Sequence, residues 1–230
     1  MTAAVDFAYN PRGIYNARGR SIMSITFYYA PQSNASRIRW SLAELGVPHD
    51  TVQVDLRAGD QKKPEFLALN PNGKVPTLVI DGTPVFESVA IQIALGERYG
   101  VEKGLWPAPD SPERLTALTW LLWGQVSLGA AIFRYMMNTS EWVPAEQHNA
   151  KQAEAAMTDV RSLLHILDAR LDGRPYLTGS TFTLADLDIC SVLGWGLHVI
   201  KVDISDLPNL QAWLSRVNGR PAAREATAET

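Results

Sequence analysis

Residues 70–91, NPNGKVPTLVIDGTPVFESVAI, hold the groups that a peptide-like ligand needs. An apolar strand is predicted at 77–80, and an Asp-Gly turn joins it to a second strand at 84–86. The acid Glu87 and the hydroxyl of Ser88 then stand at the start of an apolar helix. A strand edge can pair with an extended peptide, and a helix N-terminus with a hydroxyl can hold a carboxylate. The segment therefore predicts a binding site for a small peptide.

The composition indicates a globular protein and argues against several other classes. The chain has 230 residues, of which 46% are hydrophobic, and a formal net charge of −3. No basic run stands out, so nucleic-acid binding is not expected. The single cysteine, Cys190, excludes an intrachain disulfide and a cysteine-based zinc site, fits a reducing compartment, and is interpreted as a buried core thiol. No membrane span, metal site or redox cofactor is predicted.

The first half of the chain alternates between strand and helix patterns. Its strands and helices are expected at 24–29, 35–45, 51–55, 63–69, 77–80, 84–86 and 88–99. This order is β-α-β-α-β-β-α. A strand–helix–strand unit implies parallel pairing, and the hairpin adds antiparallel strands to the same sheet. The sequence thus predicts an α/β domain with a mixed sheet.

Four regions follow one another along the chain. Residues 1–23 are interpreted as an N-terminal extension, without the apolar region of a secretory signal. Residues 24–100 form the α/β domain, and residues 101–112 form a linker with three prolines and a glycine. Residues 113–230 are expected to be all-helical. The helices are predicted at about 112–137, 144–171, 184–200 and 208–217.

A capping box is predicted at the start of the helix at 184–200. Thr183 is followed three residues later by the acid Asp186. In this pattern the threonine side chain and the acid satisfy each other's backbone N–H groups. Phe182 before the cap and Leu187 after it can form a hydrophobic staple. Asp186 is therefore assigned an architectural role.

Four segments match a known family in their order and spacing. They are YYAPQSNASRIRWSLAELG at 28–46, NPNGKVPTL at 70–78, FES at 86–88 and FTLADLDI at 182–189. The layout resembles the cytosolic glutathione S-transferases, in the bacterial type with a serine or asparagine in the active-site loop. The resemblance spans nearly all of residues 24–217. It implies a thioredoxin-like domain followed by an all-α domain.

The same resemblance implies an activity and its partners. Family members bind glutathione as a cosubstrate, without a further cofactor, and activate its thiol for attack on a hydrophobic small-molecule electrophile. A homodimer in the cytoplasm is expected by the same resemblance. Glutathione-dependent isomerisation, peroxide reduction, reductive ether cleavage and non-catalytic ligand binding use the same site and stay open.

The resemblance assigns glutathione-binding roles in the segment described first. It implies a cis bond at Val75-Pro76, with the Val75 N–H and C=O pairing with the cysteinyl backbone of glutathione. Glu87 and Ser88 match the acid–serine pair that holds the γ-glutamyl end. The alternative for Ser88 is a cap of its own helix. Lys74 stands near the expected glycyl carboxylate, and a solvated lysine is its alternative.

The thiol donor is sought in the loop after the first strand. Its polar residues are Gln32, Ser33, Asn34 and Ser36, and Gln32 is also assigned to glutathione binding. A donor near a helix N-terminus lowers a thiol pKa from about 8.5 to about 3.5–7.5. Alignment on the basic residue Arg37 selects Ser33 in one family pattern and Asn34 in a related bacterial one. Ser33 is the preferred thiol donor and Asn34 the alternative, and either can serve as the helix N-cap.

The electrophile site is expected against the long helix at 112–137. Trp123, Ser127 and Ala131 are spaced at i, i+4 and i+8 and are predicted to share a helical face. Tyr135 is added to these three as a candidate for the electrophile site. Aromatic and methionine side chains on a long helix are often plain core, so a packing role is the alternative. Further candidates are Met136, Trp195 and His198.

Overall fold

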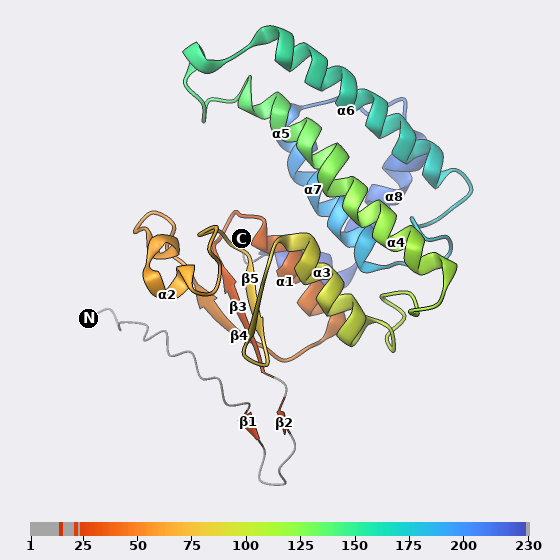
Figure 1. The fold of residues 1–230 in the computed structure, drawn as a ribbon. Helices are drawn as coiled ribbons and strands as arrows, with labels where there is room; N and C mark the ends of the chain where they lie inside the picture. Colours follow the sequence, from red (N-terminus) through yellow and green to blue (C-terminus); the bar gives the residue numbers. More distant parts are fainter. Residues whose placement is uncertain (1–13, 16–20, 23, 229–230) are drawn as a thin grey trace. The chain divides into compact units, whose positions relative to one another are not determined.

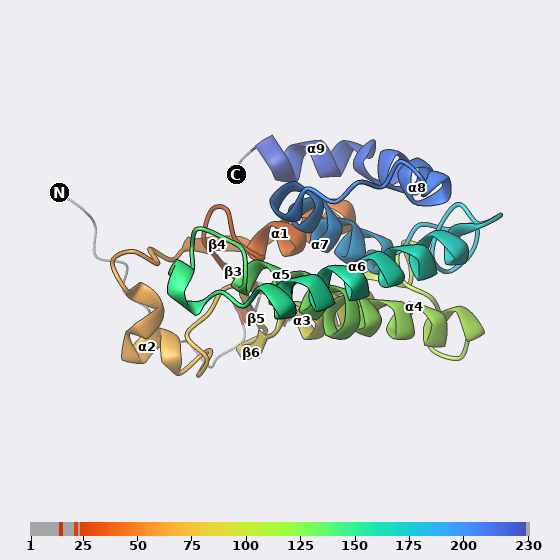
Figure 2. The same cartoon turned by 90° about the horizontal axis from the view of Figure 1, so that it is seen from above.

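The computed structural model describes residues 14–15, 21–22 and 24–228. The chain divides into two compact units (Figures 1 and 2). One comprises Met1–Ala94 with Ala226–Thr230, and the other comprises Leu95–Glu225. The expected extension 1–23 lies mostly outside the described residues. Its described part forms an antiparallel pair that the sequence did not predict, with β1 at Ile14–Tyr15 and β2 at Ser21–Ile22.

The first unit has the predicted β-α-β-α-β-β-α order, with an added 3₁₀ turn. Its elements are β3 Ile25–Tyr29, α1 Ala35–Leu45, β4 Asp50–Gln53, η1 Asp60–Lys62, α2 Pro64–Leu67, β5 Thr77–Ile80, β6 Thr83–Phe86 and α3 Ser88–Leu95. The sheet order is β4-β3-β5-β6, with β3 parallel to β4 and the other pairs antiparallel. Figure 1 shows α1 and α3 on one side of the sheet and α2 on the other. This is the thioredoxin-like arrangement that was expected.

Helix α1 has the predicted buried face. Ile38, Leu42 and Leu45 are each exposed by 1% or less. Gly46 ends the helix at φ 55°, in the left-handed region that favours glycine. On the same helix, Ser41 Oγ lies 2.7 Å from the side-chain oxygen of Gln92 in α3. This bond joins α1 and α3, whose N-termini carry the candidate site residues described below.

The second unit is all-helical, as predicted. Its elements are η2 Gly96–Gly100, α4 Pro112–Trp123, η3 Gly124–Gly129, α5 Ala130–Met137, η4 Ala145–Gln147, α6 Ala150–Leu171, α7 Leu184–Ile200, α8 Pro208–Asn218 and α9 Pro221–Ala228, the last crossing into the first unit. The segments η2 and η3 are π-helical. Figures 1 and 2 both show α5 and α6 side by side. Helix α9 was not predicted from the sequence.

The boundary between the units lies at 94/95, before the expected boundary at residue 100. Trp106 explains the difference, because this residue of the expected linker is only 2% exposed and packs over η2. A Cβ atom at Gly96 would come within 2.5 Å of the Trp106 ring. The Trp106 indole also donates a hydrogen bond of 3.2 Å to Glu97. The end of the helix that begins at Ser88 therefore packs with the helical unit.

Helix α7 forms the centre of the second unit. Gly124 lets it approach η3, since a Cβ atom there would lie 2.6 Å from Ile189. Gly196 lets it approach α5 in the same way, with a Cβ atom 2.7 Å from Ile132. Two glycines in different helices thus permit close helix packing.

The predicted capping box at the start of α7 is present. The Asp186 carboxylate accepts hydrogen bonds from the backbone N–H of Thr183 at 3.0 Å and from the Thr183 hydroxyl at 3.0 Å. It also accepts from Leu177 N–H at 2.8 Å and from the Trp213 indole at 2.9 Å. Burial raises the pKa of Asp186, and these hydrogen bonds oppose that change. Asp186 thereby fastens the preceding loop and α8 to the helix start.

One helix departs from the expectation that no segment has the character of a membrane span. Pro112–Met137 has an 18-residue window with a mean hydropathy of 1.4, of which 33% is buried. By length and composition alone it is apolar enough to cross a membrane. Core helices of soluble proteins also pass this test, and α5 packs here against α6 and α7. The apolar character of this one helix is therefore weak evidence that it crosses a membrane.

Candidate functional site

The register of the sheet brings three separate segments to one edge. Tyr28 near the end of β3 pairs with Thr77 at the start of β5, and Thr77 pairs with Phe86 at the end of β6. The loop after β3, the loop before β5 and the Glu87-Ser88 pair all continue from this edge. The residues predicted for thiol activation and for peptide binding therefore leave the sheet at neighbouring positions.

The loop before β5 presents the backbone of Val75. The Val75-Pro76 bond is cis, as predicted. Neither the N–H nor the C=O of Val75 has a hydrogen-bond partner within the described part of the chain. Pro76 is buried, whereas Val75 is half-buried and Lys74 is exposed. Val75 thus offers one donor and one acceptor to an extended ligand.

Asn70 holds this loop in place. Its side chain is 2% exposed, and its Nδ2 donates to the Lys74 carbonyl at 2.7 Å and to Thr77 Oγ1 at 3.0 Å. Its Oδ1 accepts from the Asn72 N–H at 3.0 Å. The sequence prediction missed Asn70. The signal present was an asparagine before a proline, which is typical of a turn built on side-chain hydrogen bonds.

Glu87 has an unusual backbone conformation. Its φ is +69°, a left-handed value that costs a non-glycine residue about 1–3 kcal/mol. Its carbonyl accepts from Ile91 N–H at 3.0 Å, so the helix begins at Ser88. The exposed carboxylate accepts from Asn72 Nδ2 at 3.3 Å, which ties Glu87 to the loop before β5.

Ser88 is the first residue of α3. The first N–H groups of a helix have no intrahelical partner and point toward an approaching anion. The Ser88 hydroxyl is half-buried and makes no hydrogen bond with any described residue. Ser88 therefore adds a hydroxyl to the free N–H groups at this helix end.

In the loop after β3, Ser33 caps helix α1. Its hydroxyl donates to the Ala30 carbonyl at 2.7 Å and accepts from Ala35 N–H at 3.2 Å. Its own carbonyl accepts from Ser36 N–H at 3.1 Å. Gln32 before it is exposed and has a left-handed φ of 51°. The single proton of the Ser33 hydroxyl is thus directed at the main chain.

Asn34 has a different arrangement. Its side chain is exposed and makes no capping bond to the helix. Its Oδ1 accepts a hydrogen bond of 2.8 Å from Nη2 of Arg37, which is 5% exposed. No acceptor for its Nδ2 is found among the described residues. Asn34 therefore presents an N–H donor at the N-terminus of α1.

The neighbouring tyrosines pack instead of facing the loop. The Tyr28 ring meets Phe66 edge-on with centroids 6.0 Å apart, and burial raises the pKa of Tyr28. The Tyr29 ring stacks on Phe27 at 5.6 Å and lies 4.4 Å from the Arg39 guanidinium. These contacts give both tyrosines a packing role.

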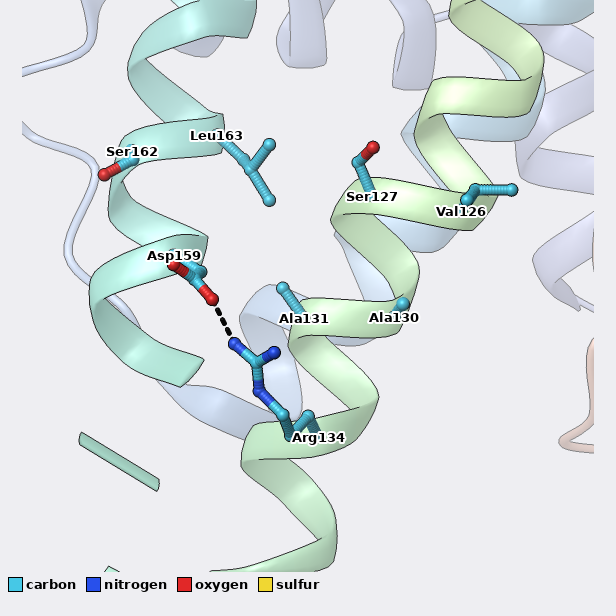
Figure 3. A pocket seen from close by; sticks show the side chains of 8 residues that line it. All are labelled: Val126, Ser127, Ala130, Ala131, Arg134, Asp159, Ser162 and Leu163. Carbon is cyan, nitrogen blue, oxygen red and sulfur yellow. Dashed lines mark hydrogen bonds and ion pairs between the residues drawn. The ribbon is translucent and has the colours of Figure 1, made fainter. Parts of the chain in front are cut away.

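A cavity of about 270 Å³ lies in the helical unit, between η3–α5 and α6 (Figure 3). It is lined by Val126, Ser127, Ala130, Ala131, Arg134, Asp159, Ser162 and Leu163. Arg134 and Asp159 form an ion pair across it. Two of the predicted electrophile residues, Ser127 and Ala131, therefore line one cavity.

The other two predicted electrophile residues do not line this cavity. Trp123 instead meets Trp120 edge-on with centroids 4.9 Å apart, and Tyr135 is half-buried elsewhere on the helix. The prediction assumed uniform α-helical spacing. Because η3 is π-helical, it adds residues to the turn and changes which side chains share a face. Of the further candidates, Met136 is buried, and Trp195 and His198 are exposed.

Cys190 is a buried core thiol, as predicted. It is 1% exposed, and its Sγ lies 3.5 Å from Asn218 Oδ1. Burial raises the pKa of the Cys190 thiol to about 12, so the thiolate is not formed at neutral pH. Within the described residues, no group of three or more His, Cys, Asp and Glu side chains is placed to hold a metal ion.

Comparison with known proteins agrees with this architecture. Residues 33–98 match the glutathione S-transferase N-terminal domain, and residues 127–221 match the glutathione S-transferase C-terminal domain. The disulfide-bond oxidoreductase YfcG of Escherichia coli is 31% identical over 212 residues, which cover 88% of this chain and 94% of that protein. Glutathione S-transferase GstB of Escherichia coli is 30% identical over 196 residues, or 84% and 92% of the two chains.

A solved relative has glutathione bound. The glutathione transferase of Burkholderia graminis, with two glutathione molecules per subunit, is 27% identical and has a TM-score of 0.76. The match covers 88% of this chain and 87% of that one. With both domains matched and two relatives at 30% identity or more over most of their length, the chain belongs to the glutathione S-transferase family.

Proposed function

We propose that this chain is a glutathione transferase that activates the glutathione thiol as a thiolate. The observation that carries the proposal is the convergence of three segments at one sheet edge, set by the register Tyr28–Thr77–Phe86. Glutathione lies extended against Val75, whose N–H and C=O pair with its cysteinyl residue. Its γ-glutamyl carboxylate binds Ser88 and the N-terminus of α3, and Glu87 binds its ammonium group.

The outer parts of the ligand have further partners. Lys74 is exposed beside Val75, so its ammonium group can pair with the glycyl carboxylate. Gln32 is exposed in the loop after β3 and contributes polar contacts to the same ligand. Both contacts lie at the solvent side. We therefore assign them smaller contributions to affinity than the contacts made by Val75 and Ser88.

Asn34 is the donor to the thiolate in this proposal. The sequence favours Ser33, with Asn34 as the alternative, whereas the hydrogen bonds in the structure support Asn34. The Ser33 proton is directed at the Ala30 carbonyl, whereas Asn34 Nδ2 is without an acceptor among the described residues. A hydrogen bond to an ionised group contributes about 1.5–3 kcal/mol, which corresponds to a lowering of the thiol pKa by about one to two units.

The reaction follows from a stabilised thiolate. The thiol proton passes to solvent, and the sulfur lone pair forms a new S–C bond with an electrophilic carbon. The leaving group departs with the electron pair of the bond that breaks. The second substrate is a hydrophobic small molecule, and we assign Ser127 and Ala131 in the cavity of the helical unit to its binding.

Three measurements test this function. Calorimetry with reduced glutathione should give a saturable binding heat, and ultraviolet titration should give a bound-thiol pKa below that of free glutathione. Turnover is then measured with a chloronitrobenzene as electrophile. Binding without a lowered thiol pKa would support the alternative of a non-catalytic ligand-binding module. Absence of binding at millimolar glutathione would contradict both.

Disulfide reduction is a second candidate, favoured by two observations. YfcG, a relative at 31% identity, is a disulfide-bond oxidoreductase, and the Burkholderia graminis relative binds two glutathione molecules per subunit. The active-site loop of this chain contains no cysteine. In this reaction one glutathione thiolate would attack the disulfide and release a thiolate. A second glutathione would then resolve the mixed disulfide to oxidised glutathione.

The two candidates are separated by their products. Oxidised glutathione, detected through NADPH consumption by added glutathione reductase, forms only in disulfide reduction. A glutathione conjugate with loss of the leaving group forms only in transfer. NADPH consumption in this coupled assay with a small dialkyl disulfide, without chloride release from the chloronitrobenzene, would favour the second candidate.

A homodimer is proposed from an exposed apolar stripe on α4–η3–α5. Its members follow one another at intervals of seven, four, seven and four residues: Leu115, Leu122, Val126, Phe133 and Met137. They are between 41% and 71% exposed. Such a stripe favours burial against a second copy, and it also accounts for the apolar character of this helix. Phe133→Arg should shift the mass in light scattering from dimer to monomer, whereas Leu56→Arg in the first unit should not.

A cytoplasmic location is proposed together with this function. The only thiol of the chain is buried and forms no disulfide, as is typical of proteins in a reducing compartment. Cell fractionation with a tagged chain tests the location. Recovery of the tagged chain in the membrane fraction would contradict it.

A further inference from the structure

Arg37 lies directly behind the proposed thiol donor. It is the third residue of α1 and 5% exposed, and its Nη2 lies 2.8 Å from Asn34 Oδ1. A guanidinium carries donors and no acceptor, so the Asn34 amide has to present its oxygen to Arg37. The nitrogen of the same amide group then points away from Arg37.

We propose that Arg37 is a positioning residue that fixes the orientation of the Asn34 amide, so that Nδ2 and not Oδ1 faces the glutathione sulfur. This inference rests on the proposed function, in which Asn34 donates to the thiolate. It assigns Arg37 no contact with the substrate. Its effect passes through Asn34 alone.

The need for such a residue follows from the symmetry of an amide side chain. The terminal torsion of asparagine is broad and roughly two-fold, so both orientations are accessible to an exposed side chain. One orientation offers an N–H donor to sulfur. The other directs a carbonyl oxygen at an anion, which is repulsive. A hydrogen bond from a charged group contributes about 1.5–3 kcal/mol, which is enough to select one orientation by a factor of about ten or more.

The local structure leaves the Asn34 side chain available to the ligand, because another residue caps the helix. Ser33 caps the helix through its bond with Ala35 N–H, so the Asn34 oxygen is not needed as a cap. Arg37 is held by burial and does not follow the motion of exposed side chains. Capping and orientation are thus divided between Ser33 and Arg37, which leaves the Asn34 nitrogen to the ligand.

A double-mutant cycle tests the inference. Arg37→Met is made in the native chain and in Asn34→Ala, and the thiol pKa of bound glutathione is measured by ultraviolet titration in all four proteins. In the native chain Arg37→Met should raise the thiol pKa by about one unit, because the amide is no longer oriented. In the Asn34→Ala background the same substitution should leave the thiol pKa unchanged.

Three comparisons separate orientation from a structural or purely electrostatic effect. Arg39→Met, two residues further along α1 and on a different face of the helix, should leave the bound-thiol pKa unchanged. Arg37→Lys keeps a charged donor and should restore part of the lowered pKa, which also covers the case in which Arg37→Met does not fold. Asn34→Asp keeps an oxygen for Arg37 but offers no N–H, so it should raise the thiol pKa further than Asn34→Ala.

The outcomes distinguish failure of the inference from failure of the function. An equal rise of the thiol pKa on Arg37→Met in both backgrounds would overturn the positioning role, since the effect would not pass through Asn34. No rise in the native background would overturn it as well. If the native chain binds no glutathione, the proposed function fails and the inference fails with it.

Discussion

Asn70 Nδ2 donates a hydrogen bond of 2.7 Å to the main-chain carbonyl of Lys74, across the turn that carries Val75. The bond lies inside the loop before β5, where Asn70 is 2% exposed. One buried amide therefore determines how the Val75 backbone is presented to a ligand. The proposed glutathione site depends on this loop as well as on the residues proposed to contact the ligand.

Asn70→Ala should lower both stability and affinity. The substitution leaves the Lys74 carbonyl and Asn72 N–H without their buried partner, at a cost of about 1–3 kcal/mol. Urea unfolding measures the loss of stability, and calorimetry measures the weaker glutathione binding. Asn72→Ala is the matched control, because its side chain contributes only an exposed bond to Glu87. Equal effects of the two substitutions would contradict the role given to Asn70.

Ser88→Ala should weaken glutathione binding about tenfold, because it removes one hydroxyl donor from the carboxylate. The fold should be unchanged, since the hydroxyl makes no bond within the described residues. Calorimetry gives the dissociation constant, and circular dichroism checks the fold. Thr83→Ala at the opposite end of β6 serves as the control. An unchanged dissociation constant for Ser88→Ala would show that the ligand carboxylate lies elsewhere.

Asp186→Ala should be strongly destabilising. Four donor groups, including the Trp213 indole, lose their shared acceptor in a site with no exposure. A loss of about 3 kcal/mol or more is expected from the unsatisfied donors. Thermal unfolding measures it, with the exposed Asp110→Ala as control. A small shift, similar to that of the control, would show that these hydrogen bonds do not hold the loop and α8 to α7.

The Cys190 thiol predicts how stability depends on alkaline pH. Its pKa is raised from 9.0 to about 12 in the folded state by burial. Between these values the unfolded chain releases a proton that the folded chain retains, so the contribution to stability is complete below pH 9 and declines toward pH 12. Cys190→Val should have a shallower decline of the free energy of unfolding in this window. Equal slopes in the native and variant chains would argue against the raised pKa.

The same burial predicts slow chemical modification. A thiol-specific reagent at mildly alkaline pH should react with Cys190 only at the rate at which the chain opens. In denaturant the reaction should reach the rate of a free thiol. Fast labelling of the folded chain would show that Cys190 is accessible.

Most of the fold follows from local patterns. The sequence predicted the bounds of α1 and β5 because apolar spacing and the Gly46 and Asp81-Gly82 signals are local. Helix α9 was missed, since the apolar residues of PAAREATA are alanines and a proline, and no large apolar side chain marks a buried face. The division of the chain at 94/95 depends on Trp106 packing over Gly96, which no local pattern reveals.

The candidate site was predictable in part. Motif and spacing select Val75, Glu87 and Ser88, and the sheet register brings their segments to one edge, while their roles in binding stay predictions. The choice between Ser33 and Asn34 could not be made from the sequence. It depends on two hydrogen bonds: the Ser33 hydroxyl donates to the main chain, and the Asn34 oxygen accepts from Arg37. Trp123 was grouped with Ser127 and Ala131 on the assumption of a continuous α-helix. A π-helical segment in η3 has no sequence signal strong enough to reveal it beforehand.

The thiol pKa of bound glutathione is the most direct measurement of the central claim. It is determined by ultraviolet titration of the complex for the native chain, Ser33→Ala and Asn34→Ala. The native complex should titrate below free glutathione, Ser33→Ala should titrate like the native chain, and Asn34→Ala should titrate about one unit higher. A native complex with the thiol pKa of free glutathione, or a shift on Ser33→Ala alone, would contradict the account.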